Sequence, residues 1–346
     1  MRVLIRGAGV AGLTLAHELA SSSINVVVTE KANRAGGGAS WFAGGMLAPW
    51  CERENAPGAV LQLGQTAADW WDAVLPGHVK RKGTLVVAPP RDTADLVRFA
   101  SRTSGFDWLK AEEIDALEPS LAGRFGKALY FAHEAHLDPR RAINALHEKL
   151  VGMGVCFRFD APDFPEKGFD RVIDCTGARA IGNDPRLRGV RGEMLVLETL
   201  DVQFSRPVRL LHPRIPLYIV PRTNNRFMVG ATMIESDDSG PVSARSLMEL
   251  LNAAYALHPA FGEARVIETG SGVRPAYPDN LPAFSEQDGM LRVNGFYRHG
   301  FLLAPAIARM AAERLLSSRA GKSEGHTTFA PPVHRQPDSS YIGASQ

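Results

Sequence analysis

Apolar and polar positions follow two distinct patterns near the start of the chain. Residues 1–5 and 24–29 are short runs of β-branched and aliphatic side chains, which are typical of buried strands in a parallel sheet. Between them, apolar residues recur at helical spacing from Val10 to about Ser21, and a run of serines then interrupts the pattern. This order predicts a strand, a helix and a second strand.

The same two patterns predict elements along the rest of the chain. Strand-like runs occupy residues 84–87, 155–159, 171–174, 193–198, 208–211, 217–220, 227–231 and 290–293. Helical spacing is found at residues 95–104, 111–117, 243–257 and 302–316, and after Leu137-Asp138-Pro139. Strands alternate with helices near both ends, whereas the strands between residues 190 and 235 follow one another directly. We therefore predict an α/β fold, α+β overall, with a Rossmann-like part and a large antiparallel sheet.

Composition and charge narrow the choice of partners. The chain has 346 residues, more than the roughly 250–300 that one hydrophobic core usually holds, so we expect two domains. Its net charge of +2 is too small for the positive field that holds nucleic acid or an anionic membrane. Three cysteines at wide spacing predict neither a disulfide framework nor a zinc site. We expect a cytoplasmic protein with a small-molecule partner, no membrane and no nucleic acid.

The turn after the first predicted strand carries a phosphate-binding pattern. Gly7, Gly9 and Gly12 form a full GxGxxG where the strand passes into the helix, and Glu30 ends the next strand. A side chain at Gly9 would block the approach of a pyrophosphate to the helix N-terminus. The Glu30 carboxylate can accept hydrogen bonds from a ribose with free hydroxyls and would repel a 2′-phosphate. FAD or NAD is therefore favoured over NADP, and the alternative is a glycine-rich turn without a ligand.

Three further segments have more than one interpretation from their residue types. Residues 36–48 are glycine-rich and nearly uncharged, which fits a loop packed on a ligand as well as a buried turn. Thr176-Gly177 follows a predicted strand and either brings backbone close to a nucleotide or simply ends the strand. His133-Glu134-Ala135-His136 lacks the HExxH spacing, so we expect a solvated loop there and no metal site.

Six ordered segments resemble the D-amino acid oxidase superfamily, and most closely its glycine oxidases of thiamine biosynthesis. They are residues 7–12, 38–47, 218–222, 230–233, 272–275 and 295–300. The resemblance implies noncovalent FAD and a discontinuous FAD-binding domain. That domain would comprise residues 1–79, 138–185 and 266–320, the substrate domain residues 80–137 and 186–265, and a tail residues 321–346.

The resemblance also assigns roles at the substrate. Arg274 matches the arginine that forms a two-pronged pair with the substrate carboxylate, and Tyr218 matches the tyrosine that donates a hydroxyl to it. A planar guanidinium suits this role because it presents two parallel donors, although a salt bridge is the plain alternative for Arg274. Met46 and Met233 match positions that wall a small pocket, where core packing is the alternative. Arg298 matches a residue close to the site.

Cofactor contacts are implied in the same way. The matching residues, besides those of the GxGxxG turn and Glu30, are Ser40, Gly45, Met46, Thr176, Gly177, Arg298, Gly300 and Leu302. The helix after Gly300 would direct the positive end of its dipole at the flavin and stabilise the anionic reduced form. No cysteine follows Cys175, so the tether that some sarcosine oxidases use has no counterpart. Pro216 departs from the polar residue that some relatives have at its position.

The implied reaction is the oxidation of glycine, and of sarcosine or small D-amino acids, to an imine, with O2 reduced to H2O2. No histidine or carboxylate in the matched segments is an obvious base, so we expect hydride transfer from the substrate Cα to flavin N5. One alternative is a D-amino acid or secondary-amine dehydrogenase that uses a quinone or protein acceptor. A more remote one is a tRNA-modifying oxidase-like enzyme. A homo-oligomer is compatible with each of these.

Overall fold

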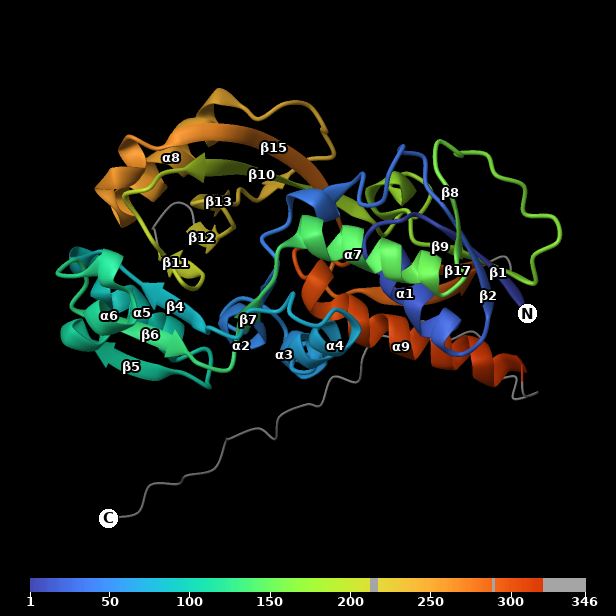
Figure 1. Ribbon diagram of the computed structural model, residues 1–346, viewed down its shortest axis with the longest axis horizontal. Helices are drawn as coiled ribbons and strands as arrows, with labels where there is room; N and C mark the ends of the chain where they lie inside the picture. Colours follow the sequence, from blue (N-terminus) through green and yellow to red (C-terminus); the bar gives the residue numbers. More distant parts are fainter. Residues whose placement is uncertain (212–216, 288–289, 320–346) are drawn as a thin grey trace, which may run out of the picture.

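The computed structural model of the protein describes residues 1–211, 217–287 and 290–319. It has a mixed α/β fold in two lobes, each built on one large sheet, and the predicted fold class is confirmed (Figure 1). Pro216, where the sequence departs from some relatives, and the tail expected at residues 321–346 lie outside the described residues. Within the described part, no helix has the length and apolar character needed to cross a membrane.

The first lobe contains a six-stranded sheet with the order β16-β17-β9-β1-β2-β8. Its strands are β1 (Arg2–Arg6), β2 (Asn25–Thr29), β8 (Cys156–Arg158), β9 (Arg171–Asp174), β16 (Ala283–Gln287) and β17 (Met290–Asn294). All neighbouring pairs are parallel except β16 and β17. The central residues of β1 and β2 are buried, as expected for parallel strands covered by helices.

Three long helices pack around this sheet. They are α1 (Val10–Ser21), α7 (Pro139–Gly152) and α9 (Gly300–Arg319), and α1 contacts both of the others (Figure 1). The start of α7 shows why a helix forms there. The Asp138 side chain accepts hydrogen bonds from the backbone N–H groups of Arg140 and Arg141, and Pro139 occupies the first helical position. The predicted strand, helix and strand at the N-terminus are confirmed as β1, α1 and β2.

The second lobe contains a nine-stranded sheet. Its order is β14-β10-β13-β12-β11-β4-β6-β5, and β15 also pairs with β10. The strands are β4 (Thr84–Val87), β5 (Asp107–Lys110), β6 (Lys127–Phe131), β10 (Arg188–Glu198), β11 (Val208–Leu210), β12 (Leu217–Pro221), β13 (Arg226–Gly230), β14 (Ile234–Glu235) and β15 (Arg265–Ala276). Only β4 and β11 pair in parallel within this described sheet. Helix α8 (Ala244–Leu257) packs on the sheet and buries Leu250 and Leu257 completely.

Shorter elements complete the two lobes. The helices are α2 (Pro49–Glu52), α3 (Gly58–Gly64), α4 (Ala67–Val74), α5 (Thr93–Ala100) and α6 (Ala111–Leu117). Helices α3 and α4 pack on α9, whereas α5 and α6 pack on strands of the second sheet. The 3₁₀ turns are η1 (Ala39–Phe42), η2 (Pro90–Asp92), η3 (Pro119–Leu121), η4 (Gly177–Ala180) and η5 (Pro259–Gly262). Strand β3 (Met46–Leu47) pairs with β7 (Ala135–His136). Residues 36–48 therefore contain a 3₁₀ turn and a short strand.

The structure differs from the sequence-based prediction at the C-terminal end. No strand was expected at β15 or β16, yet β15 pairs with β10 along nearly its whole length. The domain boundary expected at residue 266 therefore falls at the start of a strand of the large sheet, and we propose that the boundary follows Ala276. Helix α9 begins at Gly300 rather than Leu302, and it ends at Arg319 rather than at residue 316.

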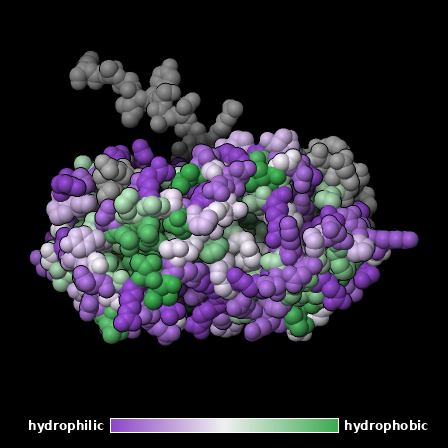
Figure 2. Space-filling view, turned by 90° about the horizontal axis from the view of Figure 1, so that it is seen from above, coloured by the Kyte–Doolittle hydropathy of each residue, from purple (hydrophilic) through white to green (hydrophobic). Residues whose placement is uncertain are grey.

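The outer face of the second lobe carries apolar side chains that are exposed. Figure 2 shows hydrophobic surface on the side of the molecule that bears α8 and the start of β15. The exposed apolar residues of these two elements are Met248, Tyr255, Val266 and Ile267, each more than 40% exposed. The same view shows a hollow near the middle of the face.

Candidate active site

A deep cleft lies where the two sheets approach each other. Its walls come from the turn after β1, the segment around η1, the end of β9, strand β15 and the start of α9. The carboxyl ends of the parallel strands β1, β2 and β9 meet at one edge of the first sheet. Ligands bind at such edges in open α/β sheets, so the cleft is the expected position for a nucleotide.

Each of the three glycines of the GxGxxG turn is required for a different structural reason. Gly7 has a φ of +102°, and a Cβ on it would collide with the carbonyl of Cys175. A Cβ on Gly12 would collide with the Gly7 carbonyl, so Gly12 allows close packing of α1 on the strand and does not itself line the cleft. Gly9 does line the cleft, and a Cβ there would narrow it. These are the roles that the fingerprint requires.

Glu30 occupies the end of β2, as the sequence predicted, and lines the cleft. Its Oε2 accepts a hydrogen bond of 2.9 Å from the Ala8 N–H, and its Oε1 accepts one of 3.0 Å from the Ala32 N–H. Arg179 Nη2 lies 2.8 Å from Oε1. The carboxylate therefore braces the glycine turn, and Arg179 is a cleft residue that sequence reasoning missed.

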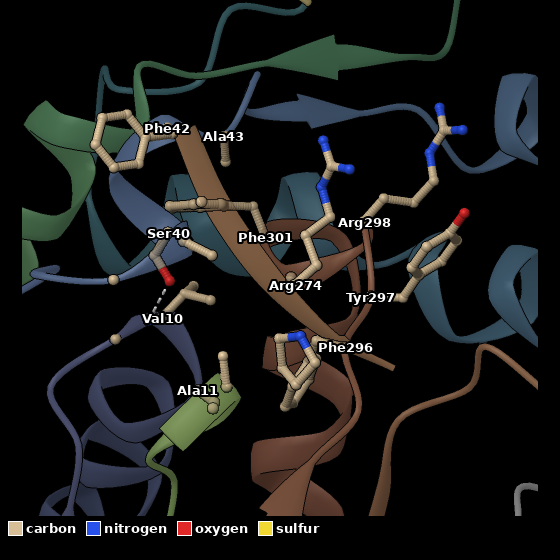
Figure 3. A pocket seen from close by; sticks show the side chains of 18 of the residues that line it. Val10, Ala11, Ser40, Phe42, Ala43, Arg274, Phe296, Tyr297, Arg298 and Phe301 are labelled. Atoms are coloured by element: carbon tan, nitrogen blue, oxygen red, sulfur yellow. Dashed lines mark hydrogen bonds between the residues drawn. The ribbon is translucent and has the colours of Figure 1, made fainter. Parts of the chain in front are cut away.

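Ser40 makes a direct contact with the start of α1. Its Oγ accepts a hydrogen bond of 3.1 Å from the Val10 N–H, the dashed line in Figure 3. Gly9, which precedes the helix, has no side chain to cap it. The first N–H of α1 is thus directed at an oxygen acceptor in the cleft, which is the geometry that a phosphate oxygen uses at a helix N-terminus.

Thr176 and Gly177 form the wall beside the end of β9. The Thr176 hydroxyl donates a hydrogen bond of 2.6 Å to Asp174 Oδ1, and its backbone N–H donates one of 2.9 Å to the same oxygen. Gly177 has a φ of +66°, and its carbonyl accepts a hydrogen bond of 3.0 Å from Asn294 Nδ2. Both residues line the cleft, and so do Gly300 and Leu302 at the start of α9.

Arg274 lies at the opposite end of the cleft, on β15. A Cβ on Gly192 of the paired strand β10 would overlap the guanidinium, so that glycine makes room for it. Arg274 Nη1 donates a hydrogen bond of 3.0 Å to the Thr232 carbonyl, and no carboxylate of the described residues lies within ion-pair distance. Burial, and then the nearby Arg298, lower the pKa of Arg274. Figure 3 shows the side chains of Arg274 and Arg298 extending in the same direction.

Tyr218 reaches the same end of the cleft from β12. Its ring covers Gly44, where a Cβ would come within 2.7 Å of the ring, and its hydroxyl lies over Gly230. The side chain is half-buried and lines the cleft. Thus the structure brings Arg274 and Tyr218, 56 positions apart in the chain, into one cavity.

Arg298 differs from Arg274 because it has a carboxylate partner. Its Nη2 lies 3.1 Å from Glu52 Oε1, and His299 Nε2 lies 3.0 Å from Glu52 Oε2. Burial alone would raise the pKa of Glu52, but Arg298, His299 and Arg209 together hold it below its usual range. Glu52 is on α2 and lines the cleft, yet no motif marks it, since Arg298 and His299 are 246 and 247 positions away in the chain.

Two methionines complete the substrate end. Met46 is half-buried in β3, after a turn in which Gly45 has a φ of +73° and a Cβ would collide with the Leu137 carbonyl. Met233 is 46% exposed, so it is not a core residue, and its Sδ lies 3.3 Å from the Tyr297 hydroxyl. Both line the cleft. Met233 therefore stands at the mouth of the cavity.

The segment from His133 to His136 departs from its prediction. His133 is exposed, but Glu134 is fully buried and His136 is 5% exposed, so a solvated loop describes only part of it. Glu134 Oε1 accepts a hydrogen bond of 2.7 Å from the Cys51 N–H, and burial raises the pKa of Glu134 to about 8. The described residues contain no group of three side chains that could hold a metal ion.

The residues of the cleft fit a dinucleotide cofactor. Gly9 leaves the approach to the backbone open, the Val10 N–H is directed at an oxygen acceptor, and Glu30 lies at the end of β2. This defines a dinucleotide-binding α/β protein with an arginine-lined cavity beyond the nucleotide end of the cleft.

Comparison with known proteins identifies the family. Residues 2–314 match the model of the DAO family, described as FAD dependent oxidoreductase, and the chain belongs to this family. It is 63% identical over 319 residues to a Rhizobium etli protein whose name provisionally assigns it to thiamine biosynthesis as the oxidoreductase ThiO. That match covers 92% of this chain and 98% of the relative.

Glycine oxidases are similar to the chain at a greater distance. The enzyme of Bacillus licheniformis is 25% identical over 349 residues, and the match covers 91% of this chain and 93% of that enzyme. The crystal structure of glycine oxidase from Geobacillus kaustophilus has a TM-score of 0.76 at 26% identity. The match covers 94% of this chain and 96% of the Geobacillus kaustophilus chain. The predicted resemblance is confirmed.

Proposed function

We propose that this protein oxidises glycine, and other small amino acids such as sarcosine and D-alanine, to the imine with O2 as electron acceptor. Relatives named glycine oxidase match over nine-tenths of the chain. When bound, FAD supplies the two-electron acceptor for this chemistry. The remaining roles fall to residues of this chain.

The main support for this proposal is that Arg274 has no carboxylate partner among the described residues. It extends into the cleft, and the described residues supply no carboxylate to neutralise it. Arg298, by contrast, is already paired with Glu52. A substrate carboxylate therefore gains most by pairing with Arg274, whose planar guanidinium can offer two parallel donors. The Tyr218 hydroxyl would donate a further hydrogen bond to the same carboxylate.

Fixing the carboxylate also orients the reacting carbon. With the substrate held by Arg274 and Tyr218, the Cα–H bond has a defined direction in the cleft, and orientation of this kind lowers the barrier. Met46 and Met233 wall the substrate end, which favours a small side chain. Arg298, linked to Met233 by an Nη1 to Sδ distance of 3.5 Å, would hold this wall rather than bind substrate.

The carboxylates of the cleft favour hydride transfer over proton abstraction from carbon. Among the described lining residues, Glu30 lies at the nucleotide end, and Glu52 is held ionised by cationic neighbours. A carboxylate with a lowered pKa is a weak base. The substrate amine then needs only to lose its ammonium proton before the hydride leaves Cα. The N-terminus of α9 opens onto the cleft and favours negative charge there.

We propose that FAD is bound without a covalent bond. The glycine turn, Ser40, Glu30 and Thr176 line the cleft and would supply polar contacts for the nucleotide. Cys175 is the cysteine that lines the cleft, and burial raises the pKa of its thiol well above the usual value, so it stays protonated and unreactive. Acid precipitation should release the yellow cofactor into the supernatant. Colour retained in the precipitate would contradict this proposal.

Oxygen consumption tests the substrate and the acceptor together. Glycine should drive oxygen uptake with one H2O2 formed per O2 consumed. Sarcosine and D-alanine should also drive oxygen uptake. If glycine reduces the flavin but oxygen reoxidises it slowly, while a quinone restores turnover, the protein is a dehydrogenase. Failure of all three substrates to reduce the flavin would overturn the proposed activity.

A further inference from the structure

A second cavity, of about 440 Å³, lies on the other side of the segment that contains Gly44 and Met46. Its walls come from residues 76–80, the start of α7, strand β7 and the end of β12. It shares no lining residue with the first cleft. Its volume falls in the range of about 300–1,000 Å³ that small-molecule pockets occupy.

Positive charge dominates this cavity. Lys80, Arg141 and Arg222 line it, and Asp138 is the acidic residue among the described lining residues. The Asp138 carboxylate is partly used, because its Oδ1 accepts hydrogen bonds from the first turn of α7. Its Oδ2 lies 3.9 Å from Arg222 Nε, at the limit of an ion pair. Two positive charges are therefore left in excess even with the two lining histidines neutral.

One of these histidines is buried, and one of its ring nitrogens has no hydrogen-bond partner among the described residues. His136 is 5% exposed, and its Nδ1 has no hydrogen-bond partner among the described residues. Burial, followed by Arg222 and Lys80, lowers the pKa of His136 to about 3. Burial also lowers the pKa of Arg222 to about 10. The cations beside His136 thus disfavour further positive charge at its buried ring, and an anion placed in the cavity would be attracted by the same cations.

We propose that the second cavity binds a small multivalent oxyanion of the phosphate or phosphate-monoester class. Lys80, Arg141 and Arg222 provide the cationic contacts. The excess of two positive charges matches a dianion better than a monoanion such as chloride. A long nucleic acid is disfavoured, because the charge is confined to one cavity and the chain as a whole carries only +2.

The cavity also contacts the wall of the first cleft. Arg222 Nη2 donates a hydrogen bond of 2.8 Å to the Gly44 carbonyl, and Gly44 lies under the Tyr218 ring. His136 pairs with Met46 between β7 and β3. An anion in the second cavity would therefore bind beside the segment that positions Met46 and Tyr218.

Calorimetric titration of the holoenzyme with inorganic phosphate, at constant ionic strength, tests the proposal. Phosphate should bind with a Kd of about 1 mM or tighter, and the double variant K80A/R141A should weaken binding at least about tenfold. Both side chains are exposed at the rim, so the fold should persist. The matched control K82A/R91A removes two exposed charges outside the cavity and should bind phosphate normally.

Two results would overturn the proposal. One is the absence of phosphate binding in the wild type. The other is equal binding by K80A/R141A and the wild type, which would place the anion elsewhere, for example at Arg274. Because the readout is binding heat rather than turnover, the result does not depend on the proposed oxidase activity.

Discussion

The two arginines at the substrate end of the cleft differ in what lies opposite each guanidinium. Arg298 and His299 share the carboxylate of Glu52, whereas Arg274 has only a backbone carbonyl as its acceptor among the described residues. A buried cation without a counter-ion is costly unless a ligand supplies one. We therefore propose that a substrate carboxylate binds opposite Arg274 and supplies the missing negative charge.

Replacing Arg274 by lysine should raise the KM for glycine while FAD and the fold are retained. Lysine keeps the charge but loses the forked pair of donors, a loss of about 2–3 kcal/mol, or roughly 30- to 160-fold in KM. Steady-state kinetics measure this. The control R226K changes an exposed arginine that pairs with Glu198 and should leave KM unaltered. An unchanged KM in R274K would remove Arg274 from the substrate site.

Replacing Tyr218 by phenylalanine should weaken substrate binding without stopping flavin reduction. The variant removes one hydrogen bond, so we expect a loss of about 1–2 kcal/mol in kcat/KM. Anaerobic stopped-flow with glycine separates binding from the reduction step. If glycine binds normally but reduction ceases, Tyr218 acts as an essential base and the hydride mechanism is wrong.

Among the elements, β15 and β7 differ most from the sequence-based predictions, and for different reasons. Gly270 and Gly272 interrupt the alternation that marks a strand, although both are needed because Phe42 and Ala39 pack closely on them. Glu134 and His136 are polar residues of a kind that is normally solvated, and only the folded chain buries Glu134 against α2 and His136 in the wall of the second cavity. By contrast, α1 and α7 were predictable, because the apolar spacing of both helices and the Asp138 cap of α7 are local in the sequence.

Burial of Glu134 should make the stability of the protein fall as pH rises. Its folded pKa of about 8 lies above that of the unfolded chain, so the neutral form favours folding below pH 4.5. This contribution is lost as pH rises to 8 and is constant above it. Relative to E134Q, the wild type should lose about 3–5 kcal/mol of unfolding free energy over that range.

Urea unfolding of both proteins near pH 5 and near pH 9 measures this difference. The control E112Q changes an exposed glutamate and should show no such pH dependence relative to the wild type. A difference between E134Q and the wild type that is the same at both pH values would mean that Glu134 is ionised in the folded protein.

In the whole molecule, the segment from Gly44 to Met46 separates two cavities of different character. One is lined by residues that the sequence motifs marked, and the other by charges drawn from three distant parts of the chain. The first was predictable because its glycine turn and its arginine stand in recognisable segments. The second, like the pairing of Glu52 with Arg298 and His299, was not predictable, because only tertiary packing brings those residues together.

Binding of phosphate in the second cavity should raise the KM for glycine. The anion would compete for Arg222 and weaken its hydrogen bond to the Gly44 carbonyl, which loosens the support under Tyr218. The coupling free energy between two binding sites is typically about 1–3 kcal/mol, so we expect the KM for glycine to rise roughly fivefold or more. The K80A/R141A variant should lose this response. The same KM in the wild type with and without saturating phosphate would show that the cavities are uncoupled.

We propose that Arg274 holds the carboxylate of a small amine substrate whose electrons pass to bound FAD. Anaerobic addition of glycine to the purified holoenzyme, while the visible flavin spectrum is recorded, tests this binding and the electron transfer together. The flavin band of the wild type should bleach completely at low glycine concentration, and R274K should require far more glycine for the same bleaching. A flavin that stays oxidised at saturating glycine, or bleaches equally in both proteins, would contradict it.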